Sequence, residues 1–497
     1  ALIHNWHNHK ARQLKASILR YSGQTDEALK FIGESLTIDK FNLGCRFEKY
    51  FIENVSTDLQ EMKEMLNGSV HNYIEYAFDF AAAGMYEEAS RIMHTYMDGE
   101  TAIYPMAAYM TGYFAAMSED TESALQWYRK AQNLSPHKCF PNRIDEVNVL
   151  TDAMKMNPED FKAPYYLGNF WYAHRCYEEA IACWEKSVEI NNRFPTALRN
   201  LSLAYYNKKG RKEEACRLLE KAFELDQTDS RIFMELDQLY KKMGRPHTER
   251  LAFLEAHPEL VAQRDDLCIE RITLYNQLGE YEKAKRLIAA QKFHPWEGGE
   301  GKVTGQYILC RVELAKKAIK ENRYAEAISL LKETEHYPHN LGEGKLINVE
   351  ENEVDYYRGI VYQKLGNEVE SIKYLMKATQ GSSEPQQAFY YNDQQPDKIF
   401  YQGLAWRALG EESKARSRFN KLIDHGKKHL FDECKIDYFA VSLPELAIWE
   451  DDLNIRNKIH CYYVMALGYS GLGQKELAEK YYSLVKELDI NKQVFRI

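Results

Sequence analysis

The chain has 497 residues, of which 45% are hydrophobic and 28% charged, and its formal net charge is −9. This length exceeds what one compact core normally takes, so we expect several domains. The mild, interspersed negative charge argues against a nucleic-acid partner, which needs a basic stripe. The longest weakly polar run, YPMAAYMTGYFAAM (104–117), is shorter than the roughly 20 residues of a membrane-spanning helix, so we predict no membrane span.

The nine cysteines are dispersed and include no C-x-x-C pair. Such a set inside helical patterns indicates small core residues in a reducing compartment rather than a disulfide framework. No signal peptide opens the chain, and we predict a cytoplasmic location. Because the first residue is Ala1 and not methionine, an upstream signal could have been removed, which leaves the periplasm as the alternative.

The first candidate for chemistry is HNWHNH, with His4, His7 and His9. Imidazoles at this spacing can bind a metal ion, but a frayed helix near the end of the chain is the favoured interpretation. We predict neither a metal site nor a cofactor.

A repeated pattern then follows along the chain. A glycine stands five residues before a small residue in many places, and an aromatic residue often stands nine before it. The glycine and small-residue pairs are Gly23/Ala28, Gly84/Ala89, Gly210/Ala215, Gly279/Ala284, Gly366/Ser371, Gly410/Ala415 and Gly473/Ala478. Units around Ala124 and Ala327 keep the small residue, whereas the unit with Gly244 has Glu249 in its place.

This spacing has a physical reason. The glycine ends one helix in a left-handed turn. The small residue lets the next helix pack closely against the first, and the aromatic fills the gap between neighbouring hairpins. Acidic residues between them, as in GRKEEA (210–215), suit a helix N-terminus.

The stretch YYLGNFWYAHRCYEEAIACWEKSVEIN (165–191) contains L-G-x2-W and, later, A-x3-W. These residues resemble the tetratricopeptide repeat. The resemblance implies an all-α fold, a right-handed superhelical solenoid of antiparallel helix pairs with about 11 units, some of them degenerate. We divide it into N-terminal units with extra helices (1–158), regular units (159–291), and units with long loops and capping helices (292–497).

The spacing changes in the last section. Between the anchors Ala180 and Ala284 the steps are 35, 34 and 35 residues, but between Ala284 and Ala415 they are 43, 44 and 44. The added residues lie in 292–306, 335–353 and 380–396, each after the second helix of a pair, so we expect them on one rim of the solenoid. A fourth loop (424–439) should continue this row, and 437–453 leaves room for an extra helix or a degenerate unit.

Two of these loops share the string G-E-G-K, at Gly299–Lys302 and Gly342–Lys345. A phosphate-binding loop is rejected, because no Ser or Thr follows the lysine and no strand precedes it. One interpretation is a sharply turning, solvated loop. The other is a partner-binding rim that presents His294, Trp296, Glu297, Glu300, Lys302, His339, Glu343 and Lys345.

Two functions are compatible with this pattern. A free-standing hydrolase is the weakest alternative, because the sequence shows no evident catalytic acid–base pair. The first is a non-catalytic scaffold that binds a protein or peptide on its concave face and loop rim. Under the second, an accessory module of an enzyme, the loops should be ordered and packed together, with Trp296 and the two lysines facing outward.

The strings HPWEGGEGKVTGQY, HNLGEGKL and HCYYVMALGYSGLG support the second function. They resemble the repeat region of large uncharacterised bacterial proteins, in which a mutarotase-like β-rich domain precedes the repeats. The resemblance implies a link to carbohydrate metabolism, and an upstream domain of the same full-length protein as a possible partner.

Overall fold

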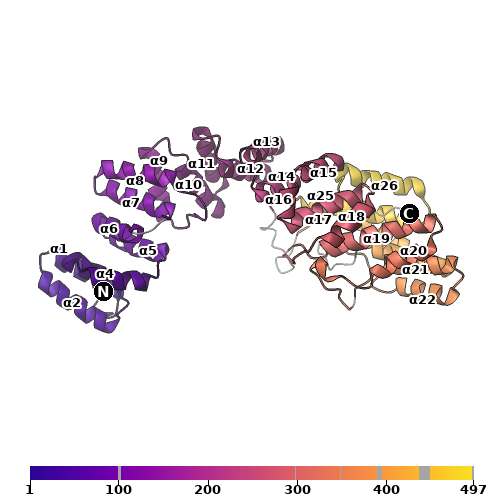
Figure 1. The fold of residues 1–497 in the computed structure, drawn as a ribbon, viewed down its shortest axis with the longest axis horizontal. Coiled ribbons are helices and arrows are strands. Elements are labelled where there is room, and N and C mark those ends of the chain that lie inside the picture. Colours follow the sequence, from indigo (N-terminus) through magenta and orange to yellow (C-terminus); the bar gives the residue numbers. More distant parts are fainter. Residues whose placement is uncertain (99–101, 297, 348, 389–394, 436–447, 495–497) are drawn as a thin grey trace. The chain divides into compact units, whose positions relative to one another are not determined.

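The structure is a computed structural model that describes residues 1–98, 102–296, 298–347, 349–388, 395–435 and 448–494. Within these ranges it contains helices and no strand (Figure 1). The chain divides into two compact parts, which we call the N-terminal body (Ala1–Ala204) and the C-terminal body (Tyr205–Ile497). The predicted all-helical class is confirmed. The division at residues 158 and 291, which follows from repeat spacing, stays a prediction.

The N-terminal body consists of helix pairs joined by short turns, with α9 as an additional helix. Its helices are α1 (His9–Tyr21), α2 (Thr25–Ile38), α3 (Leu43–Glu53), α4 (Ser56–Leu66), α5 (Val70–Ala81), α6 (Tyr86–Met97), α7 (Pro105–Met117), α8 (Thr121–Asn133), α9 (Asp145–Met156), α10 (Lys162–Ala173), α11 (Tyr177–Ile190) and the first part of α12 (Pro195–Lys209).

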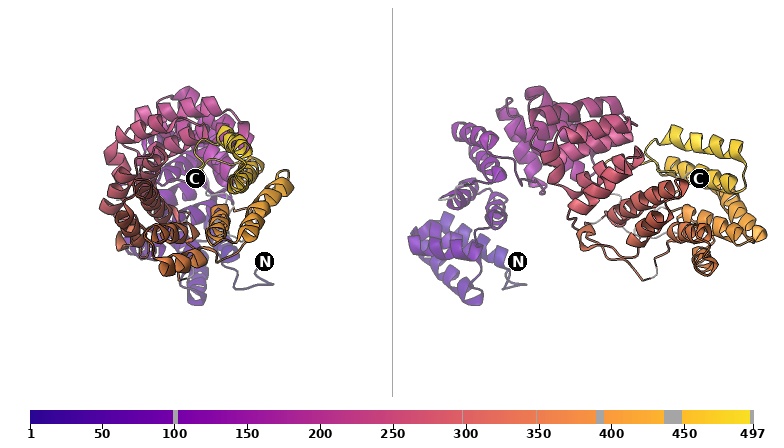
Figure 2. Two further views of the ribbon diagram at one scale, coloured as in Figure 1. Left: turned by 90° about the vertical axis from the view of Figure 1, so that its right-hand side faces the viewer. Right: turned by 45° about the vertical axis from the view of Figure 1, so that its right-hand side comes forward.

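The C-terminal body continues the pairing. It contains the end of α12 and then α13 (Lys212–Leu225), α14 (Ser230–Lys242), α15 (His247–Glu255), α16 (Pro258–Ala262), α17 (Asp265–Gln277), α18 (Tyr281–Ala290), α19 (Lys302–Lys320), α20 (Tyr324–Glu333), the 3₁₀ turn η1 (His339–Leu341), α21 (Asn352–Lys364), α22 (Glu368–Ala378), α23 (Pro396–Ala408), α24 (Glu412–His429), α25 (Leu453–Gly471) and α26 (Lys475–Leu488). These helices follow one another around a curve (Figure 2).

The turn between the helices of a pair has the predicted left-handed geometry. Gly84, for example, has φ of 78°. Where the repeat lacks the glycine, another residue takes the same conformation five positions before the small residue: Glu119 (φ 65°), Arg175 (φ 63°) and Asn322 (φ 59°). A side chain at positive φ is strained. The hairpin therefore imposes this backbone shape whether or not the sequence offers a glycine.

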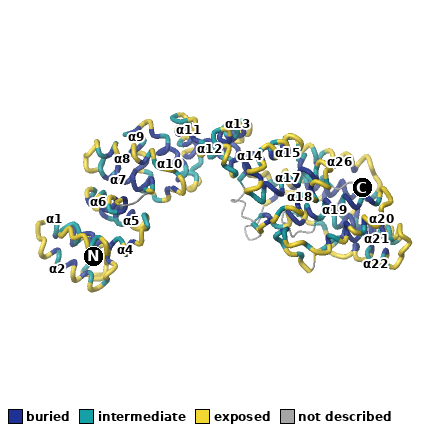
Figure 3. Tube along the Cα trace, viewed as in Figure 1, coloured by how far each residue is buried: buried dark blue, intermediate teal, exposed yellow. Residues whose placement is uncertain are grey.

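Close packing inside the pairs also follows the prediction. Ala28, Ala124 and Ala415 are fully buried. The first helix contributes glycines of its own to this contact: a Cβ on Gly168 would lie 2.5 Å from the Trp184 ring. Buried residues accordingly follow the lines where neighbouring helices meet, and exposed residues gather at the turns (Figure 3).

Two sequence expectations need correction or refinement. The predicted fourth loop is wrong at its start, because α24 continues to His429. Gly426 does not break this helix, since it is buried where α25 approaches closely, near the Cys461 carbonyl oxygen. In the unit without a small residue, Glu249 is exposed and its neighbour Arg250 is fully buried. The core position is thus taken by a paired arginine rather than by an alanine.

Candidate functional site

The C-terminal body holds a short non-helical segment of its own chain, residues 448–452, against α12 and α14. We call this surface the α12–α14 groove. The side-chain amide of Asn207, on α12, donates to the carbonyl oxygen of Ile448 at 2.8 Å and accepts from the main-chain N–H of Glu450 at 2.9 Å. One amide thereby satisfies both main-chain groups on either side of Trp449, as a neighbouring strand would.

Trp449 is the apolar anchor of this segment. Its side chain is 3% exposed, and its ring meets the edge of Tyr206 with centroids 5.1 Å apart. The indole N–H donates to the main-chain carbonyl oxygen of Glu235 in α14 at 3.1 Å. A carbonyl oxygen has two lone pairs, so it can accept this bond in addition to its helical one. The groove therefore recognises both the flat ring and its polar edge.

Two lysines pair with the acidic residues that follow. Lys208 on α12 contacts the carboxylate of Glu450, and Lys242 on α14 contacts that of Asp451. Both carboxylates are about half exposed, at 50% and 49%. Exposed ion pairs contribute little to stability, but they select the sign of charge and speed association.

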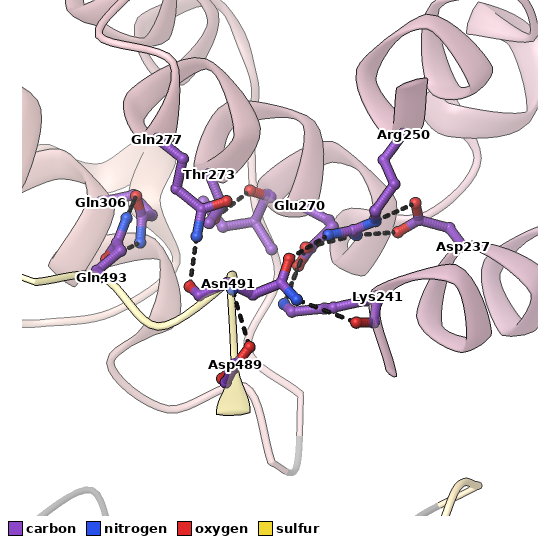
Figure 4. Close-up of polar contacts among 11 residues, drawn as sticks. Asp237, Lys241, Arg250, Glu270, Thr273, Gln277, Gln306, Asp489, Asn491 and Gln493 are labelled. Atoms are coloured by element: carbon purple, nitrogen blue, oxygen red, sulfur yellow. Dashed lines mark hydrogen bonds and ion pairs between the residues drawn. The ribbon is translucent and has the colours of Figure 1, made fainter. Parts of the chain in front are cut away.

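The residues after α26, 489–494, form a second non-helical segment, which we call the strap. It lies on the inner side of the curve of the C-terminal body (Figure 2), against α14, α17 and α19. The Asn491 amide donates to the carbonyl oxygen of Lys241 at 3.0 Å, and Gln277 donates to the carbonyl oxygen of Asn491. Gln493 and Gln306 pair through their amides at 3.3 Å (Figure 4).

Beneath the strap lies a cluster of buried charges (Figure 4). Arg250 donates to Asp237, to Glu270 at 2.8 Å and to Asn491 at 3.2 Å. Burial raises the pKa of Asp237, although Arg250 opposes the shift. Burial also acts on Glu270, but the charges of Lys241 and Arg250 outweigh it and lower its pKa. The strap is thus fastened to a fully paired ionic core.

Residues 448–452 and the strap both border a cavity of about 750 Å³. Its wall mixes cations and acids, among them Lys212, Arg456, Asp452 and Asp489. His460 contributes a neutral imidazole, because burial and the nearby Lys492 lower its pKa to about 3. Its Nε2 therefore donates to the carbonyl oxygen of Gln386 at 2.7 Å.

The first two rim loops pack against each other. The Phe293 N–H donates to the carbonyl oxygen of Asn340 at 2.8 Å, and the Asn340 amide donates to the carbonyl oxygens of Ile288 and Gln291. Phe293 and Leu341 are buried. Glu343 of the second loop accepts from the Gly301 N–H at 3.1 Å and from Thr304 Oγ1 at 3.1 Å, so it caps the start of α19. The first two rim loops are therefore fixed in place by their contacts with each other.

The other predicted rim residues of the first loop have different surroundings. His294 is exposed, and its N–H and ring Nδ1 contact Asp265 at 2.8 and 3.0 Å. Trp296 is half-buried, with its ring over Gly299. Glu300 is half-buried. Lys302 is exposed at the start of α19. Glu297 lies outside the described residues.

Of the three rim residues predicted in the second loop, His339 is exposed, whereas Glu343 and Lys345 are half-buried. Lys345 turns inward and donates to the Thr334 carbonyl oxygen at 2.8 Å and to Glu351 at 2.6 Å. The two G-E-G-K strings therefore differ in role, since Gly301 and Glu343 meet while the lysines point to different surroundings. Whether the rim binds a partner stays a prediction.

Sequence reasoning missed Asn207, Trp449 and Asn491. Asn207 lies in an ordinary repeat helix, and its partners stand more than 240 residues away. The available signal was the segment 437–453, which lacks the repeat anchors. Of it, residues 437–447 lie outside the described ranges, and 448–452 form no helix. A tryptophan followed by three acids in a non-repeat segment was the clue to a docked peptide.

The part of the chain that the structure describes contains no cluster of three or more His, Cys, Asp or Glu side chains arranged to hold a metal ion. In the same ranges, no helix combines the length and apolarity needed to cross a membrane.

Residues 197–229, which include Asn207, match the family model described as tetratricopeptide repeat. Solved structures that resemble the chain include the TPR domain of P58(IPK), at 12% identity over 91% of this chain and 99% of that one, with a TM-score of 0.26. A tetratricopeptide repeat protein from Parabacteroides merdae has 13% identity over 61% and 98%, with a TM-score of 0.26.

The third is YrrB, titled a TPR protein with an unusual peptide-binding site, at 16% identity over 47% of this chain and 95% of that one, with a TM-score of 0.19. At these TM-scores, none of the three determines how the helices of this chain are arranged. The family match identifies residues 197–229 as a tetratricopeptide repeat, and helix pairs with the same left-handed turns occur before and after it in the described part of the chain.

Proposed function

We propose that the chain is a non-catalytic scaffold that binds a protein or peptide partner through the inner side of the C-terminal body and its rim loops. The observation that carries this is the Asn207 contact, in which a repeat helix holds the main chain of a non-helical segment from both sides. A surface that binds main-chain groups and buries an aromatic side chain is suited to a peptide.

The experiment compares two sets of variants in quantitative cross-linking within the cells that produce the protein. The groove set is Asn207→Ala with Lys242→Glu, and the rim set is His294→Ala with His339→Ala. We expect one partner to be lost from the groove set, and a further loss from the rim set if the rim contributes. A partner profile that is unchanged in both sets, with both proteins folded, contradicts the proposal.

The second candidate is an accessory module of a larger carbohydrate-active protein, with the rim loops docking on an upstream domain. The contact between the first two rim loops favours it, because a docking rim should be ordered. Lys345 and Trp296 count against it, since neither faces outward as that function requires. Adding a candidate upstream domain in trans tests this: the rim variants should lose binding and the groove variants should keep it.

A further inference from the structure

We propose that the α12–α14 groove is the binding site for an extended peptide with a tryptophan followed by two acidic residues, and that residues 448–452 occupy it as an internal competitor. This rests on the proposed scaffold function and names the chemistry of the partner. Three features of the occupant define that chemistry: its main chain, its aromatic ring and its charges.

The main-chain contact does not depend on sequence. Asn207 bonds the carbonyl oxygen of Ile448 and the N–H of Glu450, groups that every residue except proline offers. Residues 448–452 lead directly into α25, whose first turn Asp452 caps, and the main-chain groups on either side of Trp449 lie outside that helix. Here a side chain of another helix satisfies them, so a second chain in the same extended conformation would find the same partners.

The aromatic contact supplies the first element of specificity. The Trp449 ring is buried against Tyr206, and its N–H donates to the Glu235 carbonyl oxygen at 3.1 Å. Phenylalanine could fill the space, but it would leave that oxygen without its second donor. The site therefore prefers tryptophan over phenylalanine at this position.

The charged contacts supply the second element. Lys208 and Lys242 meet the two positions after the tryptophan, and Lys212 lines the adjoining cavity. Because the bound carboxylates are half exposed, these pairs guide an acidic peptide without locking it in place. Residues 448–451 are held by one buried ring, one amide and two half-exposed ion pairs, and an external peptide has to replace these contacts to take the site.

The internal segment has the advantage of tethering. Residues 448–452 run directly into α25, whose first turn Asp452 caps, so they stay close to the groove at an effective concentration on the order of millimolar or more. An external peptide of equal intrinsic affinity therefore binds the native chain weakly, and binds a chain with a weakened internal segment more tightly. A natural partner must exceed the internal segment in affinity or local concentration.

The test measures binding of a fluorescent peptide with the sequence of residues 448–454 (IWEDDLN) to the full chain. Trp449→Ala and, separately, Glu450→Lys with Asp451→Lys weaken the internal segment. The second variant changes only exposed side chains, which guards against misfolding. We expect both to bind the peptide at least tenfold more tightly than the native chain, and Asn207→Ala added to either should abolish the gain.

Two controls accompany these variants. Trp406→Ala, on α23, removes a tryptophan that packs against the separate α23–α26 core, and it should leave peptide affinity at the native value. A peptide with the acids placed before the tryptophan (DDEWILN) should bind at least tenfold more weakly. On the native chain, saturating peptide should increase hydrogen exchange in residues 448–452, since the internal segment is displaced.

Equal affinity of the native chain and both weakened variants would overturn the proposal. The proposal would also fail if the weakened variants bind the peptide but millimolar peptide does not displace residues 448–452 in the native chain. Residues 448–452 would then be a permanent part of the surface. If the peptide fails while the Asn207 variants still lose a cross-linked partner, the partner chemistry is wrong and the scaffold function stands. If the Asn207 variants lose no cross-linked partner and the peptide does not bind, the scaffold function and the proposed peptide site are both wrong.

Discussion

Arg250 and Asp237 form a two-point ion pair inside the C-terminal body, with Nε to one carboxylate oxygen at 3.1 Å and Nη2 to the other at 2.7 Å. Neither side chain is more than 1% exposed. Removing one partner leaves a buried charge uncompensated, and this is far more costly than removing both. We expect Arg250→Ala to lower the free energy of unfolding by roughly 3–5 kcal/mol.

The measurement is urea denaturation, with hydrogen exchange of α14 and α15 to locate the effect. The double variant Arg250→Met with Asp237→Leu is the matched control, because it removes both charges and keeps volume. It should regain most of the lost stability. If Arg250→Ala lowers the free energy of unfolding by less than about 1 kcal/mol, water replaces the lost ion pair.

The left-handed turns give a reciprocal pair of substitutions in the N-terminal body. Glu119 is exposed and has φ of 65°, where other repeats have glycine. Glu119→Gly should raise the free energy of unfolding by about 1 kcal/mol, because relief of strain exceeds the added entropy of the unfolded chain. Gly84 has φ of 78°, and a Cβ added there would meet no other atom within 4 Å, so Gly84→Ala should lower stability by about the same amount through the backbone alone.

Both substitutions are followed by thermal and urea unfolding. Arg129→Gly, at an exposed position inside α8, shows the ordinary cost of a glycine and should lower stability. If Glu119→Gly also lowers stability, the turn gains nothing from glycine and the strain argument is wrong.

The left-handed turns and the close packing within helix pairs were predictable, because residues only a few positions apart determine them. Gly210 and Ala215 specify a turn and a close contact by their own chemistry. The α12–α14 groove depends instead on Asn207 meeting Ile448, 241 residues later, and no local pattern encodes that pairing. The fourth loop was misjudged for a related reason: Gly426 resembles a helix end, and only the approach of α25 explains why the helix continues through it.

The long connections were predicted in their place along the chain but not in the direction of their side chains. Three long connections follow α18, α20 and α22, as the spacing required. Which side chains turn outward depends on loop-to-loop contacts such as Glu343 with Gly301. Identical strings in the two loops therefore gave no guide to the different surroundings of Lys302 and Lys345.

A glycine of the first rim loop controls the position of Trp296. A Cβ on Gly299 would lie 2.2 Å from the Trp296 ring, so Gly299→Ala should push the ring outward. We expect tryptophan emission to shift to longer wavelength, read as the difference between Gly299→Ala and the same variant with Trp296→Phe. Gly305→Ala, within α19 and facing open space, is the control and should leave emission unchanged. An unchanged difference spectrum in Gly299→Ala would show that the ring does not rest on the glycine.

The last prediction concerns pH. Glu353 on α21 accepts from the Tyr401 hydroxyl at 3.0 Å, and burial, with Asp397 adding a like charge, raises its pKa to about 8. The unfolded value is about 4.3, so between these values the folded chain keeps a proton that the unfolded chain has lost. The stability contributed by this proton is fully present below about pH 4.3, and it falls as the pH rises through about 8.

Glu353→Gln removes this titration. Relative to the native chain, the variant should become progressively more stable from pH 5 to pH 8.5, by at most roughly 5 kcal/mol. Asp397→Asn should move the native midpoint to lower pH, because it removes the like charge. The measurement is urea unfolding of all three proteins at matched ionic strength across that range. A constant difference between the native chain and Glu353→Gln would mean that Glu353 is already ionised in the folded chain, and that water reaches the α21–α23 contact.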